Sequence, residues 1–362
     1  MRLITTLLAT TLLALPASAS TDKEFRDWWA ACDNLRNCSA YGFDTQLTGG
    51  GYIRIERGGG PSAQAKIILV AYAPDGVTFR LSFDDPALPG LPADVQSGDE
   101  VDASDMRRVT FDGDTVAPLI ESLRKAKTIV ITRVDPPGKK SETAVSTISL
   151  NGAVAALLWI DEQQKRLGTA TALIRRGDKP ESSVPPQPKA PVIVAAKGLS
   201  GASADRTPSE RDLAAIKKKA VQQCGEGDEG ELEEASALSP DTFLYPIRCP
   251  DSSGAYNHAY TFLIARAGQP QSARTPKFRW PVKIGDREKD SEGEDLLINA
   301  DFSNADMTMT TFNKGRGIGD CGDEERWVYD GKMFRLAEVK TMPHCRGVPL
   351  EDWPTVYRAT VK

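Results

Sequence analysis

The amino-terminal segment determines the compartment in which the chain folds, and that compartment determines the chemistry of its cysteines. Arg2 supplies a short positive region, Leu3 to Leu15 is mostly apolar, and Ala17-Ser18-Ala19 provides the small residues that signal peptidases require. The apolar run of about 13 residues is shorter than the roughly 20 needed to cross a bilayer as a helix. The sequence therefore predicts a cleavable signal peptide over residues 1–19 and no membrane span in the mature chain.

The cysteines all lie downstream of this segment, and their number is even. In a secreted chain this favours disulfides over free thiols. Six cysteines permit 15 connectivities. The order along the chain favours the pairs Cys32–Cys38, Cys224–Cys249 and Cys321–Cys345. A zinc site is the alternative, but the chain has no C-x-x-C pair, and His258 and His344 lack ligand spacing. We therefore expect three disulfides, no metal and no cofactor.

A proline-rich stretch divides the mature chain. Residues 178–195 contain prolines too dense for a helix or a central strand, so we expect an extended, semi-rigid spacer or strap. The mature chain of about 340 residues is long enough for two ordinary domains. The sequence thus predicts an N-terminal β-rich domain over 20–177, the linker over 178–195, and a C-terminal helix-plus-antiparallel-sheet domain over 196–362.

Alternating and β-branched runs predict the secondary structure of both domains. In the first we expect helices over 115–126 and 152–166, the second with Asn151 as N-cap, and strands over 51–57, 66–72, 77–83, 128–134 and 144–149. In the second, Thr207-Pro208-Ser209-Glu210 fits a capping box for a helix ending near Gln223. Strands follow over 242–248, 259–266, 277–284, 296–300, 307–313, 326–329, 333–339 and 356–361, with a two-residue turn at Asp330-Gly331. The sequence therefore predicts an α+β, strand-rich fold with two sandwich-like domains of largely antiparallel sheets, each covered by one or two helices.

Motifs for catalysis or metal binding are incomplete. Ser122-Leu123-Arg124-Lys125 matches S-x-x-K, but neither Ser-Asp-Asn nor Lys-Thr-Gly occurs to complete such a site. The acidic run over 226–234 could bind calcium, but it lacks the ordered spacing of an EF-hand loop, so a solvated loop is favoured. No catalytic, cofactor-binding or metal-binding residues are assigned.

The stretch over 314–322 is the most informative candidate site. Its alternate glycines could form an anion-binding nest with Arg316, although a tight, disulfide-pinned connection between strands is the favoured interpretation. Arginine, tryptophan and aspartate side chains converge in sequence around the Cys321–Cys345 pair, which is the composition of a recognition patch. The candidate patch consists of Arg316, Asp320, Trp327, Arg346 and Trp353.

Several segments together resemble the family of secreted bacterial proteins called domain of unknown function 1176. They include Phe25 to Asn34 with Cys38, Ser149 to Ala153, Trp159-Ile160-Asp161 with Gln164, the proline linker, Arg316 to Gly322, and Cys345-Arg346-Gly347. This resemblance spans nearly the whole mature chain and implies periplasmic residence in Gram-negative bacteria. The amino-terminal half is also similar, more faintly, to the invasion-associated locus B family. Neither resemblance carries catalytic residues over to this chain.

The sequence therefore favours a non-enzymatic, disulfide-stabilised binding or interaction module of the cell envelope, whose partner is an envelope protein or a glycan. A net charge of −5 argues against a nucleic-acid partner, whose phosphates require a basic face. One alternative is an envelope hydrolase that uses acidic residues, since paired carboxylates need no conspicuous motif. Another is an inhibitor of a lytic enzyme, suggested by size, location and disulfides.

Overall fold

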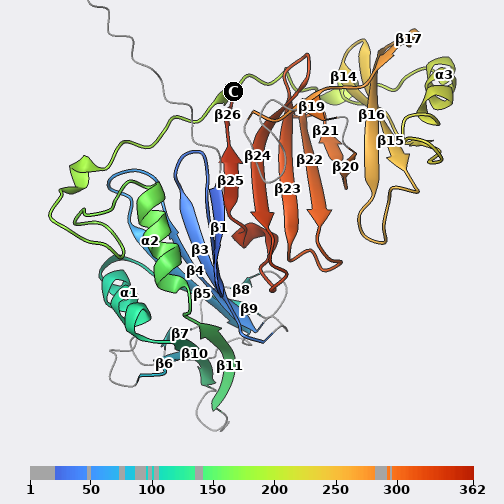
Figure 1. Ribbon diagram of the computed structural model, residues 1–362. Helices are drawn as coiled ribbons and strands as arrows, with labels where there is room; N and C mark the ends of the chain where they lie inside the picture. The colour runs from blue at the N-terminus through green and yellow to red at the C-terminus, as the bar shows by residue number, and fades with distance from the viewer. Residues whose placement is uncertain are drawn as a thin grey trace, which may run out of the picture.

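The chain folds into a strand-rich structure with antiparallel sheets in both halves (Figure 1). The computed structural model describes residues 21–46, 50–72, 78–85, 95–96, 100–101, 106–134, 142–281, 292–293 and 296–362. The predicted signal peptide lies outside the described residues. Among the strand pairs described, only β12–β26 and β18–β24 are parallel. The strand-rich, antiparallel part of the fold prediction is confirmed.

The N-terminal half contains two sheets and two α-helices. The first sheet has the order β1 (Thr21–Phe25), β2 (Trp28–Cys32), β3 (Cys38–Phe43), β4 (Gly51–Arg57), β5 (Ala65–Tyr72), β9 (Met106–Phe111) and β8 (Glu100–Val101). The second has the order β11 (Glu142–Ser149), β10 (Thr128–Val134), β6 (Thr78–Phe83) and β7 (Val95–Gln96). The helices are α1 (Val116–Lys125) and α2 (Ala153–Gln163), which cover one face of the first sheet in Figure 1.

The C-terminal half contains two sheets and one α-helix. One sheet contains β13 (Glu231–Leu232), β14 (Ser236–Ser239), β15 (Thr242–Cys249), β16 (Ala259–Arg266), β17 (Gln269–Arg274) and β20 (Leu297–Ile298). The other contains β18 (Phe278–Arg279), β19 (Glu292–Gly293), β21 (Asp301–Ser303), β22 (Thr308–Lys314), β23 (Gly322–Tyr329), β24 (Phe334–Met342) and β25 (Thr355–Arg358). Helix α3 (Glu210–Ala220) lies at the outer end of this half (Figure 1).

Strand β2 shows why the first sheet is buried on both faces. Side chains alternate across a strand, so Trp28 and Ala30 pack under α2 in the N-terminal core. Trp29 and Ala31 face the other way and join a cluster that contains Trp327 and Tyr357 of the C-terminal half. The two halves therefore share a hydrophobic cluster, and the predicted division into two domains remains a prediction.

The linker is fastened to the N-terminal half at the loop closed by the first disulfide. The Arg36 guanidinium donates to the carbonyls of Pro185 and Pro186, and the Gln187 amide donates to Asn37 Oδ1 at 2.8 Å. Further on, β12 (Val192–Ile193) pairs with β26 (Thr360–Val361) near the carboxyl terminus. Segment 178–195 therefore lies along both halves as a strap.

Two helix starts differ from the prediction. The N-cap of α2 is Gly152, not Asn151, because the chain enters the helix at φ +108° and a Cβ there would lie 1.7 Å from the Phe25 carbonyl oxygen. The N-cap of α3 is Ser209, whose hydroxyl accepts from the Asp212 amide, so the capping box predicted at Thr207 is wrong. Helix α3 also ends at Ala220, short of the predicted end.

The turn between β23 and β24 is longer than predicted. Tyr329 pairs with Phe334, so the loop runs over 330–333 and is not a two-residue turn. The Asp330 carboxylate accepts from the amides of Lys332 and Met333, which stabilises the longer loop. Of the strand predicted over 277–284, the structure shows β18 over Phe278–Arg279. Residues 282–284 lie outside the described residues.

Candidate binding site

Disulfides fix the loops at which the candidate residues lie. The structure contains the pairs Cys32–Cys38, Cys224–Cys249 and Cys321–Cys345, in the predicted order. The last joins the loop between β22 and β23 to the segment that follows β24. On the chain-entropy model, a closed loop of 24 residues stabilises the fold by about 3 to 4 kcal/mol.

Loop 314–322 is a tight connection rather than an open nest. The Gly315 amide donates to the Cys321 carbonyl at 2.7 Å, which closes the loop. Arg316 reaches Asp320 with two nitrogens, Nε to Oδ1 at 2.6 Å and Nη2 to Oδ2 at 2.5 Å. The Gly347 amide donates to the same carboxylate at 2.6 Å. The charge of Arg316 is therefore compensated inside the loop.

The electrostatics of Asp320 follow from these contacts. Burial opposes ionisation of the carboxyl group, but the Arg316 guanidinium and the Gly347 amide outweigh it and hold the pKa of Asp320 below its usual value. The pair joins loop 314–322 to the segment after Cys345, beside the disulfide. It stabilises this corner of the molecule.

The candidate recognition patch is not a single exposed surface. Trp327 is fully buried, and its indole donates to Glu325. Trp353 is 4% exposed, and its indole donates to the Val348 carbonyl. Including the tryptophans in an exposed patch is therefore a mistake, because both lie in the cluster shared by the two halves. Arg346 lies elsewhere, in a pocket between the halves.

That cavity, which we call the His344 pocket, has a volume of about 270 Å³. Its N-terminal wall comes from the β1–β2 turn, the end of β3 and the end of β11. Its C-terminal wall is the loop after β24. The residues that line it are Glu24, Arg26, Asp27, Trp28, Phe43, Asp44, Thr45, Ser149, His344 and Arg346. The two halves thus build the pocket together.

His344 occupies the boundary between the two walls. Its Nε2 lies 2.8 Å from Glu24 Oε1, and its ring centroid is 5.2 Å from that of Phe43 and 5.8 Å from that of Trp29. The imidazole is therefore held between aromatic side chains and a carboxylate. The side chain is 28% exposed, so one side of it remains accessible from the pocket.

The β1–β2 turn positions the N-terminal wall. Arg26 has φ +58°, and its guanidinium donates to Asn151 Oδ1 at 3.1 Å. The Ser149 hydroxyl donates to Asp27 Oδ2 at 2.6 Å, and the Asp27 amide donates to the Asn151 carbonyl. The segment that resembles the family pattern at Ser149 to Ala153 therefore holds this turn in place.

The pocket combines both signs of charge with aromatic surface. Arg26 and Arg346 can donate, whereas Glu24 and Asp27 can accept. Asp44 is 5% exposed and already accepts from the Gln46 amide. Because Ser149 donates its proton to a carboxylate rather than to His344, the pocket holds no serine–histidine pair among its lining residues. Such a site offers hydrogen-bond donors, acceptors and aromatic surface to a small ligand.

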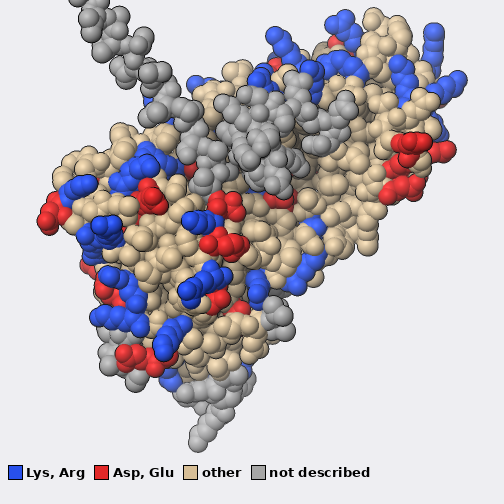
Figure 2. Space-filling model, in the orientation of Figure 1, with Lys and Arg blue, Asp and Glu red and all other residues tan. Residues whose placement is uncertain are grey.

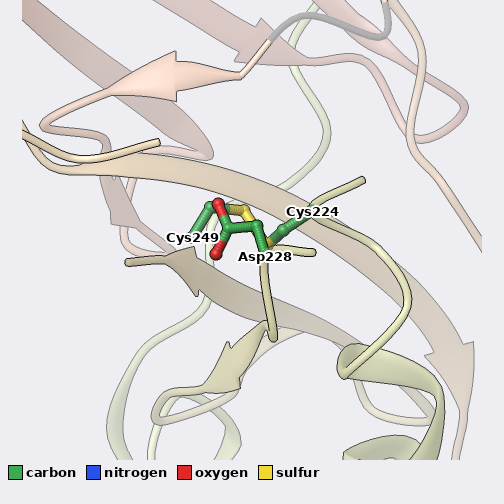
Figure 3. A group of neighbouring side chains, drawn as sticks. All are labelled: Cys224, Asp228 and Cys249. Carbon is green, nitrogen blue, oxygen red and sulfur yellow. A yellow bond between two sulfur atoms is a disulfide. The ribbon is translucent and has the colours of Figure 1, made fainter. Parts of the chain in front are cut away.

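Two clusters have the composition of metal sites. Figure 3 shows Cys224, Asp228 and Cys249 together, and Asp320 lies similarly beside Cys321 and Cys345. The sulfurs in both are joined as disulfides, so they cannot bind a metal as thiolates, and each cluster keeps only one carboxylate as a ligand. Asp228 accepts from the amides of Asp251 and Ser252, which fixes its carboxylate within its own loop. Neither cluster fits a metal ion.

Comparisons with known proteins identify the family of this chain. Residues 22–360 match the family described as "Protein of unknown function (DUF1176)", and the chain belongs to this family. It is 31% identical over 359 residues to "Uncharacterized protein YpfG" of Escherichia coli (strain K12), with 94% of this chain and 93% of that protein covered. The family prediction is confirmed, and the match spans both walls of the His344 pocket.

A weaker likeness concerns a solved structure. "Crystal structure of invasion associated protein b from bartonella henselae" is 18% identical, with a TM-score of 0.29, and covers 40% of this chain and 99% of that one. At that TM-score the likeness supports no conclusion about this chain.

In the described residues, none of the helices has the length and apolar character needed for a membrane span.

Proposed function

We propose that this chain is a non-enzymatic binding module of the bacterial cell envelope, exported by its signal peptide and holding the end of a glycan in the His344 pocket. The observation that carries the proposal is that one pocket, built from both halves, contains cationic, anionic and aromatic side chains. Carboxylates and guanidinium groups hydrogen-bond sugar hydroxyls, and aromatic side chains supply apolar contact area. A volume of about 270 Å³ limits the ligand to a short fragment.

The test measures binding of envelope glycan fragments to the disulfide-intact chain by isothermal titration calorimetry. We expect a fragment to bind to the wild type and Arg346→Ala to weaken its binding about tenfold, as the loss of a charge-assisted hydrogen bond predicts. Arg211→Ala is the matched control, because Arg211 is exposed on α3, away from the pocket. Equal binding by the wild type and Arg346→Ala would contradict the proposal.

The second candidate is an envelope hydrolase that uses acidic residues. It is favoured by the two carboxylates, Glu24 and Asp27, that line the same pocket. A turnover assay on polymeric envelope glycans separates the two functions. Catalysis that is lost in Asp27→Asn, with the fold retained, would establish the hydrolase and replace the binding proposal.

A further inference from the structure

A second cavity, of about 570 Å³, lies where the linker meets the start of β24, at the opposite end of that strand from His344. One wall is segment 191–195, which includes β12. The floor contains Leu336 of β24 and Tyr357 of β25, both buried. The residues that line this cavity do not overlap those of the His344 pocket.

Strand β12 has one paired edge and one open edge. The amides of Thr360 and Lys362 donate to the carbonyls of Pro191 and Ile193, and the Ala195 amide donates to the Lys362 carbonyl. Because alternate residues of a strand point their backbone groups to opposite edges, those of Val192 and Val194 point away from β26. Within the sheets of the described residues, β26 is the sole neighbour of β12.

The two residues whose backbone groups form this open edge, Val192 and Val194, have apolar and exposed side chains. Val192 is 56% exposed and Val194 is 68% exposed, whereas Ile193 between them is buried in a small cluster with Val328 and Ala337. The buried residue anchors the strand, so its open edge is held in an extended conformation. An exposed, ordered edge that carries β-branched residues is a template for the addition of another strand.

The charges around the cavity indicate which strand would fit. Of the described residues that line it, Arg279, Lys332 and Arg335 are cationic and Asp330 alone is acidic. Arg335 Nε lies 2.8 Å from Asp330 Oδ2, so that carboxylate is already paired. Lys332 is exposed at the tip of the β23–β24 loop. The described lining therefore carries more positive than negative charge, and the exposed Lys332 complements an anionic partner.

We propose that the open edge of β12 binds an extended acidic segment of a partner protein by strand addition. The backbone of the segment pairs with Val192 and Val194. The apolar side chains on one face of the segment contact these valines, and the acidic side chains on its other face meet Lys332 at the cavity. This partner site is separate from the glycan site proposed above.

The test uses the full mature chain and a fluorescein-labelled ten-residue peptide of alternating Glu and Val, followed by fluorescence anisotropy. We expect this peptide to bind and a Lys–Val peptide of the same length not to bind. Lys332→Glu should weaken binding of the acidic peptide about tenfold by reversing one charge. Equal affinity for the acidic and basic peptides would overturn the proposal.

A proline substitution separates strand addition from general charge attraction. Val194→Pro removes an outward-facing N–H that β26 does not use, so the β12–β26 pairing should persist while peptide binding is lost. Val194→Thr keeps the N–H and the strand propensity, and it should bind as the wild type does. Hydrogen exchange at Val192 and Val194 should slow when the acidic peptide is added.

The remaining outcomes are equally decisive. Unchanged binding by Val194→Pro, or unchanged exchange at the two valines, would refute strand addition. Concentration-dependent dimerisation of the wild type that Val194→Pro abolishes would show that a second copy of the chain occupies the edge, and it would also refute the proposal. Arg346→Ala should leave peptide binding unchanged, so failure of the glycan proposal and failure of this one are distinguishable.

Discussion

Asp352 is the buried charge that joins the two halves, and replacing it should have a large effect on stability. Asp352 ends the 3-10 helix Leu350–Asp352 of the C-terminal half, and its carboxylate lies against the first sheet of the N-terminal half. The Tyr52 hydroxyl donates to Oδ2, while Arg54 Nη1 and Arg108 Nη2 lie 2.9 and 2.7 Å from Oδ1. Burial and the nearby carboxylate raise the pKa of Tyr52 well above its usual value, so its hydroxyl remains a donor.

The magnitude follows from the burial of each partner. The Asp352 side chain is 3% exposed and that of Arg54 is 12% exposed, so Asp352→Asn removes the buried counter-charge of a largely buried guanidinium and leaves it only the partly exposed Glu56. Breaking one partner of a buried pair costs about 3 to 5 kcal/mol. Because Arg108 is 32% exposed and partly solvated, we expect the lower end, about 3 kcal/mol.

Urea denaturation followed by tryptophan fluorescence measures this cost, provided that the transition is two-state. Glu56→Gln is the matched control. Glu56 lies 3.3 Å from Arg54 but is 35% exposed, so its loss should cost less than about 1 kcal/mol. If Asp352→Asn costs no more than Glu56→Gln, the buried carboxylate does not hold the halves together and the reasoning is refuted.

Three further predictions concern the disulfide, the α2 start and the acid response. Replacing Cys321 and Cys345 by serine should lower the free energy of unfolding by about 3 to 4 kcal/mol, measured by urea denaturation, because the unfolded chain gains loop entropy. Gly152→Ala should destabilise the fold by more than about 3 kcal/mol or prevent folding, because the new Cβ would overlap the Phe25 carbonyl. The pKa of Asp320 is lower in the folded state than in the unfolded chain, where it is near 4, so its ionisation stabilises the fold above that pH. This stabilisation is lost as the pH falls through the folded pKa. The difference in the free energy of unfolding between wild type and Asp320→Asn should therefore narrow below about pH 4.

Each of these has a control. The Cys32–Cys38 loop spans only 6 residues, so its removal should cost nearer 2 kcal/mol, and a larger cost there would contradict the entropy argument. Gly60→Ala should be tolerated, because a Cβ at that position meets nothing within 4 Å. A gap between wild type and Asp320→Asn that stays constant from pH 6 to pH 2 would show that the carboxylate is not stabilised by ionisation.

The sequence predicted the elements whose pattern is local. Helix α1 buries Val116, Leu119, Ile120 and Leu123, which recur at helical spacing. Strand β2 was not predicted, because Trp-Trp-Ala-Ala-Cys is apolar throughout and shows no alternation when both faces of its sheet are covered. Its two-sided burial depends on the C-terminal half, which no local pattern reveals.

The sequence predicts only part of the candidate site, because the pocket depends on contacts between segments far apart in the chain. Arg346 and His344 were noticed beside a cysteine, and both line the pocket. The sequence favours Trp353 as part of the patch because it lies near the Cys321–Cys345 pair in the chain, but the fold buries its side chain. Asp27 belongs to the segment Phe25 to Asn34 that resembles the family, but no local pattern marks it or Glu24 as a site residue, because only the fold brings the β1–β2 turn to the pocket.

The measurement that tests the central claim most directly is hydrogen exchange of the disulfide-intact chain with and without a bound envelope glycan fragment. The proposal of one pocket built by two halves predicts slower exchange in two distant segments together, the β1–β2 turn over 24–28 and the loop over 344–346. Protection confined to one half, or located away from both segments, would contradict it.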